Sequence, residues 1–158
     1  YGTLELAADG SWNFTLFNES TAVQSLSENE IVNLSFAVEA IDGTSAGNIT
    51  ILVEGTDDAA IISGDTSDTI QLPFDAPVAD GTVIVTDIDE GESGMIAAAY
   101  EGEYGTLEMN SNGDWIYMFT DFAAIDDAIT LFEHVTVETI GGTQFDIDVT
   151  ISEFIIQM

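Results

Sequence analysis

Four carboxylates that could bind a cation lie within six residues of one another, at Asp87, Asp89, Glu90 and Glu92. Alternate residues of an extended segment point to the same side, so the side chains of Asp87 and Asp89 converge. Gly91 lets the backbone turn, and Glu92 can close the ligand shell. Calcium takes about six to eight oxygen ligands, which carboxylates supply; the spacing is not that of an EF-hand. The stretch predicts a calcium site, and the alternative is an acidic, solvated loop.

The composition makes cations the natural partners of this chain. Its 158 residues include 30 Asp and Glu, no Lys or Arg and one His, for a formal charge of −30. The hydrophobic content of 46% favours a folded chain with an acidic surface over a disordered acidic tail. Nucleic acid and anionic membranes are excluded as partners because both need a basic surface. The lack of cysteine excludes disulfides and thiolate metal sites.

The chain contains an internal repeat. The block that begins Tyr1-Gly-Thr-Leu-Glu-Leu returns as Tyr104-Gly-Thr-Leu-Glu-Met, an offset of 103 residues. Further on, Val38-Glu-Ala-Ile-Asp-Gly-Thr44 returns as Val137-Glu-Thr-Ile-Gly-Gly-Thr143. A period of about 100 residues is too long for a small solenoid repeat and indicates whole domains in tandem.

The second copy has a leader, residues 61–103, that the first copy lacks. We therefore expect residues 1–60 to be the C-terminal part of a first repeat without its early strands, and residues 61–158 to be a complete second repeat. Asp57 and Asp58 stand where the first copy ends. A calcium ion there would make the two repeats rigid relative to each other, and the alternative is an acidic flexible linker.

Each copy of the repeated block predicts an antiparallel hairpin. Apolar and polar residues alternate on both sides of Asp9-Gly10 in the first copy and of Asn112-Gly113 in the second. A period of two around such a turn is typical of a hairpin with one buried face. Trp12 and Trp115 fall on the apolar phase, so both are predicted to be core residues.

Further elements follow each hairpin and precede the second one. We expect short helical turns at residues 21–26 and 122–128, and strands at 31–41, 48–54, 69–74, 81–86, 131–140 and 144–152. Pro73 cannot donate to a central ladder, so its segment should be an edge strand or a bulge. About seven short strands per complete repeat predict an all-β fold of immunoglobulin-like (cadherin-like) β-sandwich repeats, with a short helical turn in each.

These motifs, taken in order, resemble the VCBS repeat over nearly the whole chain. The matching elements are Tyr-Gly-Thr-Leu, Asp/Asn-Gly-x-Trp, Ala22-Val-Gln-x-Leu26, the turn Asp42-Gly-Thr44 and the closing Gly55-Thr-Asp-Asp-Ala59. The family usually closes on Gly-Thr-Asn-Asp-Ala-Pro, where this chain has Asp57 and Ala60. The stretch from Val85 to Glu92 is similar to the family's early Thr-Asp-x-Asp-x-Gly-Asp.

The resemblance implies a function and a cofactor. VCBS repeats occur in giant calcium-dependent (RTX-type) surface adhesins of Gram-negative bacteria, often exported by type I secretion. Membership would imply that calcium is a cofactor and that the protein lies outside the cell, at the bacterial surface or secreted. It would also imply that the turn acid Asp42 binds calcium. The second copy departs from the family pattern at Gly141, which stands in place of Asp42, and in its ending from Ser152 to Met158.

The sequence gives no support for catalysis. His134 is the only histidine, and no Gly-x-Ser-x-Gly motif accompanies it, so we interpret it as a strand residue. Glu101 and Glu103 have the residue type of a glycosidase pair, but chance pairs of acids are expected in so acidic a chain. We predict that the chain is not an enzyme.

Two outward positions of the second hairpin are apolar, which is costly on a solvated face. Ile116 and Met118 stand where the first copy has Asn13 and Thr15. Such a face needs a cover, either from the chain's own leader, from Phe154-Ile-Ile, or from another subunit.

Three functions agree with these patterns. The first is a non-enzymatic, calcium-stabilised extracellular β-sandwich module of a bacterial surface adhesin that acts in spacing or adhesion, with calcium ions and adjoining repeats or copies of itself as partners. The second is a self-assembling subunit of an extracellular filament, joined by strand donation or domain swapping, because a sandwich without its early strands exposes open edges. The third is a sugar-binding module, which would need exposed aromatic residues beside a calcium site.

Overall fold

The structure is a computed structural model that describes residues 1–73, 75–126 and 130–153. The chain folds into two compact units. The first comprises Tyr1–Asp58 with Ile88–Glu90, and the second comprises Ala59–Asp87 with Gly91–Met158. No helix among the described residues is long and apolar enough to cross a membrane.

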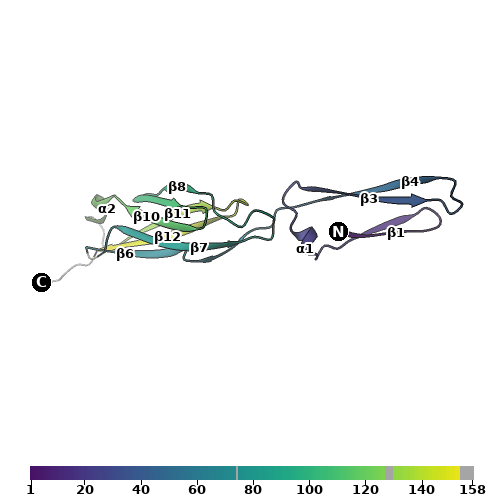
Figure 1. Ribbon diagram of the computed structural model, residues 1–158. Coiled ribbons are helices and arrows are strands. Elements are labelled where there is room, and N and C mark those ends of the chain that lie inside the picture. Colours follow the sequence, from purple (N-terminus) through teal and green to yellow (C-terminus); the bar gives the residue numbers. More distant parts are fainter. Residues whose placement is uncertain (74, 127–129, 154–158) are drawn as a thin grey trace. The chain divides into compact units, whose positions relative to one another are not determined.

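The second unit is a two-layer β-sandwich (Figure 1). One sheet has the strand order β5 (Ile61–Gly64), β7 (Val78–Thr86), β10 (Asp114–Phe119), β9 (Gly105–Met109) and β8 (Ala98–Glu101). The other has the order β11 (Thr130–Glu138), β12 (Gln144–Glu153) and β6 (Ser67–Leu72). All pairs are antiparallel except β12 with β6, and the helical turn α2 (Phe122–Asp126) follows β10. Alternating apolar residues of the two sheets form one core around Trp115, Ile70 and Ile147.

The first unit has two hairpins that belong to separate sheets, drawn as two layers in Figure 1. They are β1 (Gly2–Leu6) with β2 (Trp12–Leu16), and β3 (Ile31–Glu39) with β4 (Ala46–Glu54), joined through the helical turn α1 (Thr21–Gln24). The register of β1–β2 repeats that of β9–β10, since Trp12 pairs with Leu6 as Trp115 pairs with Met109.

The all-β, immunoglobulin-like sandwich predicted from the sequence is confirmed, with both hairpins and both helical turns. The strand before Pro73 lies at the edge of its sheet, as proline requires, but it ends at Leu72 instead of position 74, which lies outside the described residues. The expected end of the second helical turn, residues 127 and 128, also lies outside them. Two short strands, β5 and β8, were not predicted, because four residues give too short a run for periodicity to be recognised.

The prediction that Trp12 is a core residue was wrong. Trp12 is 51% exposed, whereas its counterpart Trp115 is 1% exposed. The apolar phase of the hairpin is the same in both units, but strand β7 pairs with β10 beside Trp115. Within the described residues, the sheet that contains Trp12 consists of β1 and β2 alone. Burial here depends on neighbouring strands and not on the hairpin's own sequence.

The outward residues Ile116 and Met118 are 48% and 45% exposed. They lie on the central strand β10, where Ile116 pairs with Asp80 on one side and Glu108 on the other. The segment Phe154-Ile-Ile, one of the predicted covers, lies outside the described residues. The predicted contact with another subunit stays a prediction.

Candidate metal centre

The acidic loop that follows β7 is closed by hydrogen bonds between the backbone of Asp87 and the side chain of Ser93. The amide of Asp87 donates to Oγ of Ser93 over 3.0 Å, and that hydroxyl donates to the carbonyl of Asp87 over 3.2 Å. Gly91 has a φ of +87°, a left-handed conformation that L side chains rarely adopt. The predicted turn at Gly91 therefore exists, and it places the loop's carboxylates on a closed segment six residues long.

Asp89 is the most deeply placed acid of this loop. It is 2% exposed, and its Oδ2 accepts a hydrogen bond of 2.8 Å from the amide of Asp58. Asp57, Asp89 and Glu92 each offer a carboxylate oxygen, and these oxygens lie within 4.8 Å of one another. The structure thus brings together three of the residues that the sequence singled out.

Asp87 and Glu92 also converge, over the backbone of Gly141. A Cβ atom on Gly141 would collide with Oε2 of Glu92 and would lie 3.3 Å from Oδ2 of Asp87. A side chain at position 141, where the first copy has Asp42, would therefore have to displace the carboxylate of Glu92 from its present place. The sequence analysis recorded this replacement of an acid by glycine, but the closeness of position 141 to Glu92 and Asp87 appears only in the structure.

The remaining predicted ligands lie apart from this trio. Glu90 is exposed on the loop, and the carboxylate of Asp58 is exposed although its amide contacts Asp89. Asp42 lies in the β3–β4 turn, where its Oδ1 accepts from the amide and hydroxyl of Thr44 over 3.0 and 2.7 Å. These hydrogen bonds lower the pKa of Asp42. The arrangement gives Asp42 a role in closing the turn.

The donors of the trio are carboxylate oxygens alone, which suits a hard cation such as calcium or magnesium. Sulfur and imidazole donors, which zinc and copper favour, are absent from it. Three carboxylates at this spacing repel one another, and a divalent cation among them would turn the repulsion into attraction. The residues present therefore fit calcium, which would draw further oxygen ligands from backbone carbonyls and water.

A second buried acid, Glu133, has a different surrounding. It is 3% exposed, and its carboxylate accepts from the hydroxyl of Tyr117 over 2.8 Å and from the amides of Glu103 and Tyr104 over 3.0 and 2.7 Å. Burial and, next, the hydrogen bond to Glu133 raise the pKa of Tyr117 above its usual range. Three donors satisfy this carboxylate, so it acts as a structural link between β11 and the residues before β9. The overlooked signal in the sequence was a glutamate on the inward phase of a strand.

The only histidine is exposed. His134 Nδ1 lies 2.7 Å from Oδ1 of Asp148 on the neighbouring strand β12, and this hydrogen bond raises the pKa of His134. The pair is a cross-strand contact on a solvated face, which agrees with the interpretation of His134 as a strand residue.

Comparison with known proteins places the chain in no family. No family model matches the chain, and no curated protein matches it. Among solved structures, it is similar to the extracellular domain of protocadherin GammaB4, with 15% identity and a TM-score of 0.43 over 97% of this chain and 25% of that one. It is also similar to extracellular cadherin domains 1–4 of protocadherin Gamma B7, with 14% identity and a TM-score of 0.42 over 98% of this chain and 39% of that one. The chain thus spans well under half the length of either protein.

Proposed function

We propose that this chain is a non-enzymatic, calcium-stabilised β-sandwich module of an extracellular bacterial surface adhesin of the VCBS type, acting in spacing or adhesion. The observation that carries the proposal is the trio Asp57, Asp89 and Glu92, whose carboxylate oxygens lie within 4.8 Å of one another around a side chain that is 2% exposed. The ordered sequence motifs that resemble the VCBS repeat support the same function.

The charge of the whole chain gives calcium a thermodynamic role. A formal charge of −30 without Lys or Arg opposes compaction through self-repulsion, which salt screens only in part. A cation that binds only the folded state stabilises it by about 2.7 kcal/mol at a hundredfold excess over its dissociation constant. Calcium would therefore act as a structural cofactor for a protein that works outside the cell.

The test compares calcium with salt of equal ionic strength. Thermal unfolding in calcium chloride should show a higher Tm than in sodium chloride at matched ionic strength, and calorimetry should give a defined number of bound ions. Asp89→Asn should weaken binding in part, because the amide oxygen can still accept from the amide of Asp58. Glu108→Gln removes one exposed charge from the second unit and is the matched control. Equal Tm values in the two salts would mean that salt only screens the acidic surface and that calcium is not bound specifically, which would contradict the proposal.

Self-assembly into a filament is a second candidate, and one observation favours it. The first unit exposes Trp12, Leu6 and Leu16 on the inward phase of its first hairpin, at 51%, 46% and 38%. Light scattering on the chain with and without calcium tests this function. Long calcium-dependent polymers would support it, and a monomer in both conditions would contradict it.

A further inference from the structure

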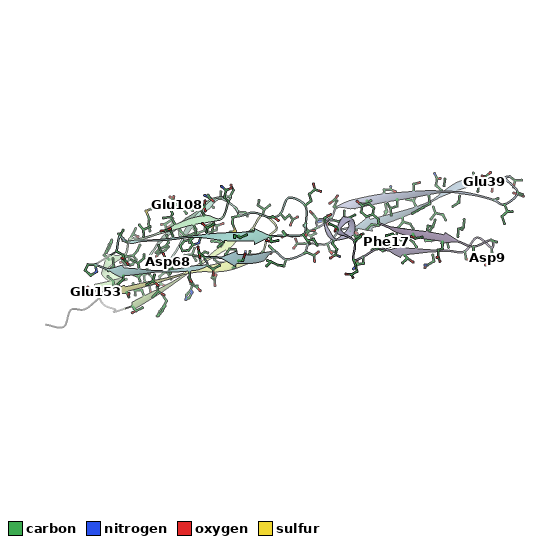
Figure 2. All side chains as sticks on the ribbon, turned by 60° about the horizontal axis from the view of Figure 1, so that its bottom comes forward. Asp9, Phe17, Glu39, Asp68, Glu108 and Glu153 are labelled. Atoms are coloured by element: carbon green, nitrogen blue, oxygen red, sulfur yellow. The ribbon has the colours of Figure 1, made fainter. Side chains whose placement is uncertain are left out.

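The first unit has an open space between the tips of its two hairpins. The space has a volume of about 780 Å³. It is lined by Leu6 and Ala8 from the β1–β2 side and by Glu39, Ala40 and Ile41 from the β3–β4 side. Figure 2 shows Asp9 and Glu39 at the same end of this unit, one on each hairpin. Ile41 is 91% exposed there, so the two tips do not close over each other.

The equivalent place in the second unit is filled by a residue of the leader, Met95, which is 1% exposed. Its amide donates to the carbonyl of Ser111 over 3.4 Å, and it forms an isolated bridge with Thr139. By the internal repeat, Ser111 corresponds to Ala8 and Thr139 to Ala40. Both of these line the open space of the first unit.

The residues on either side of Met95 complete this link. The amide of Ile96 donates to Glu138 over 3.2 Å, and the amide of Ile140 donates to Gly94 over 2.9 Å. Glu138 and Ile140 correspond to Glu39 and Ile41 of the first unit. One short piece of the leader thus joins the two hairpin tips of the second unit, and the same pair of tips in the first unit stands apart.

The leader also covers the tryptophan of the second hairpin. Trp115 pairs with Gly81 of β7, and a Cβ on Gly81 would lie 2.7 Å from the indole ring, so only glycine lets the strand approach. The indole Nε1 donates to the carbonyl of Asp65 over 2.7 Å. Trp12 occupies the same place on its hairpin, at a sheet edge with no further strand among the described residues.

The inward face of the first unit is free of the chain's charge. None of the 30 acids falls on the strand phase of Leu4, Phe14, Leu34 and Ile51, the phase that the two hairpins turn toward each other. The rings of Phe14 and Phe36 meet across it at 6.0 Å. An apolar segment can therefore lie along these strands without facing a carboxylate, and acids come near it only at the hairpin tips, where Asp9, Glu39 and Asp42 line the open space.

We propose that the first unit is an acceptor for the leader segment of another repeat of this kind. The segment would add a strand to the edge of β2, with a glycine opposite Trp12 and a backbone carbonyl for its Nε1. It would also place an apolar side chain the size of methionine between Ala8 and Ala40. This proposal does not depend on calcium.

Stoichiometry decides against a second copy of the chain as the donor. The described residues contain one leader and two hairpin pairs that could take it, and the leader already fills the second pair. Moving it into the first unit of another copy would open its own unit and gain no contacts. The occupant is therefore a leader other than residues 61–103, which are already packed in the second unit.

The test adds a synthetic peptide of residues 61–103 to the full chain. The peptide contains no tryptophan, so fluorescence reports only Trp12 and the already buried Trp115. Acrylamide suits the experiment as quencher because it is neutral, and salt of about 0.15 M shortens the Debye length to about 8 Å. We expect binding to saturate at one peptide per chain, and the quenchable tryptophan fluorescence to fall to the level that a Trp12→Phe chain shows.

Two variant peptides make the test specific. Gly81→Val should bind about tenfold more weakly or worse, because its side chain would overlap the indole ring. Thr82→Val introduces the same side chain at the neighbouring exposed position and should bind like the natural peptide. Equal affinity of all three peptides would overturn the proposal.

A second arm keeps the proposal testable if the peptide aggregates. A copy of residues 61–103 joined ahead of Tyr1 of the full chain should protect Trp12 from acrylamide in a monomer. Unchanged quenching in that fusion would overturn the proposal. Protection of Trp12 in oligomers of the unmodified chain, without any added leader, would also overturn it, in favour of self-assembly.

Discussion

The two units carry the same hairpin in two different environments. Trp12 and Trp115 follow the same Tyr-Gly-Thr-Leu block and have the same strand register, yet one is half exposed and the other buried. The difference lies in strand β7 and the residues around Asp65, which reach the second tryptophan. Turn and alternation fix a hairpin locally, while the strands added to its edges decide which residues become core.

The comparison extends to the residues behind each tryptophan. In the second unit, Tyr117 donates to the buried carboxylate of Glu133. By the repeat, Phe14 and Leu34 take these places in the first unit. The second unit thus holds a polar link that its own backbone amides satisfy, and the first unit has two apolar residues at these places that need no such donors.

Truncating the two tryptophans should give the largest difference between the units. Trp115→Ala should lower the free energy of unfolding of the second unit by about 3–5 kcal/mol, since it leaves a cavity in a packed core. Trp12→Ala, the matched control, should cost the first unit less than about 1 kcal/mol because half of the side chain is already solvated. Denaturant unfolding followed by circular dichroism measures both, and equal losses would contradict the view that only the second hairpin is covered.

Removing the buried carboxylate should have the next largest effect. Glu133→Ala leaves the Tyr117 hydroxyl and two amides without their acceptor and should cost about 3 kcal/mol or more. Leu34→Ala at the corresponding place of the first unit should cost less, since that side chain is only half-buried. Combining Glu133→Ala with Tyr117→Phe should lose less than the sum of the two single losses, as a double-mutant cycle would show. Strict additivity would mean that the hydrogen bond contributes nothing.

Exchanging the turn residues should destabilise both units, but by different amounts. Gly141→Asp, measured in chelator, should destabilise the second unit by about 1–3 kcal/mol, because its Cβ overlaps the carboxylate of Glu92 and its charge adds to the repulsion. Asp42→Gly should cost the first unit less, because it removes only two hydrogen bonds at an exposed turn. A harmless Gly141→Asp would show that the acidic loop does not need the space above this glycine.

Acid should loosen the turns of the first unit with the smallest effect of the four. Hydrogen bonds from Ser11 lower the pKa of Asp9, as those from Thr44 lower that of Asp42, both from 3.8. A lowered folded-state pKa contributes stability above pH 3.8 that is lost as the pH falls through the folded-state value. Amide chemical shifts of Ser11 and Thr44 from about pH 5 to pH 2 should report this loss.

The corresponding hairpin of the second unit supplies the control for this titration. Asn110 accepts from the amides of Asn112 and Asp114 over 2.9 and 3.0 Å, and this acceptor does not ionise. Its own amide donates to Asp114 over 3.0 Å and lowers the pKa of that acid, so the turn has a titrating group at a different place. Asp9→Asn should remove the titration at Ser11 while an acceptor oxygen remains. A titration at Ser11 that persists unchanged in Asp9→Asn would show that the acid sensitivity belongs to the whole chain and not to this turn.

Several features of the candidate site could be read from the chain itself. The run from Asp87 to Glu92 could be recognised as a candidate cation site by its residue types, and Gly91 predicted the turn. The place of Asp57 beside Asp89 could not be read, because the two residues lie 32 positions apart and meet only through the fold. Met95 was missed for the same reason, since its contacts are with a distant strand. Glu133 was missed although its place on the inward phase of a strand was visible in the sequence.

The sequence by itself determined the repeat, the hairpins, the helical turns and the two-layer β architecture, because alternation, turn residues and internal likeness are local properties of a chain. Only the tertiary structure decided which tryptophan is buried, which acids meet and why Gly141 carries no side chain. These outcomes depend on strand neighbours that are distant in sequence, such as β7 beside β10 and β6 beside β12. Which side chains are buried and which acids meet depends on those neighbouring strands. The alternation within one strand predicts an apolar face but not the element that packs against it.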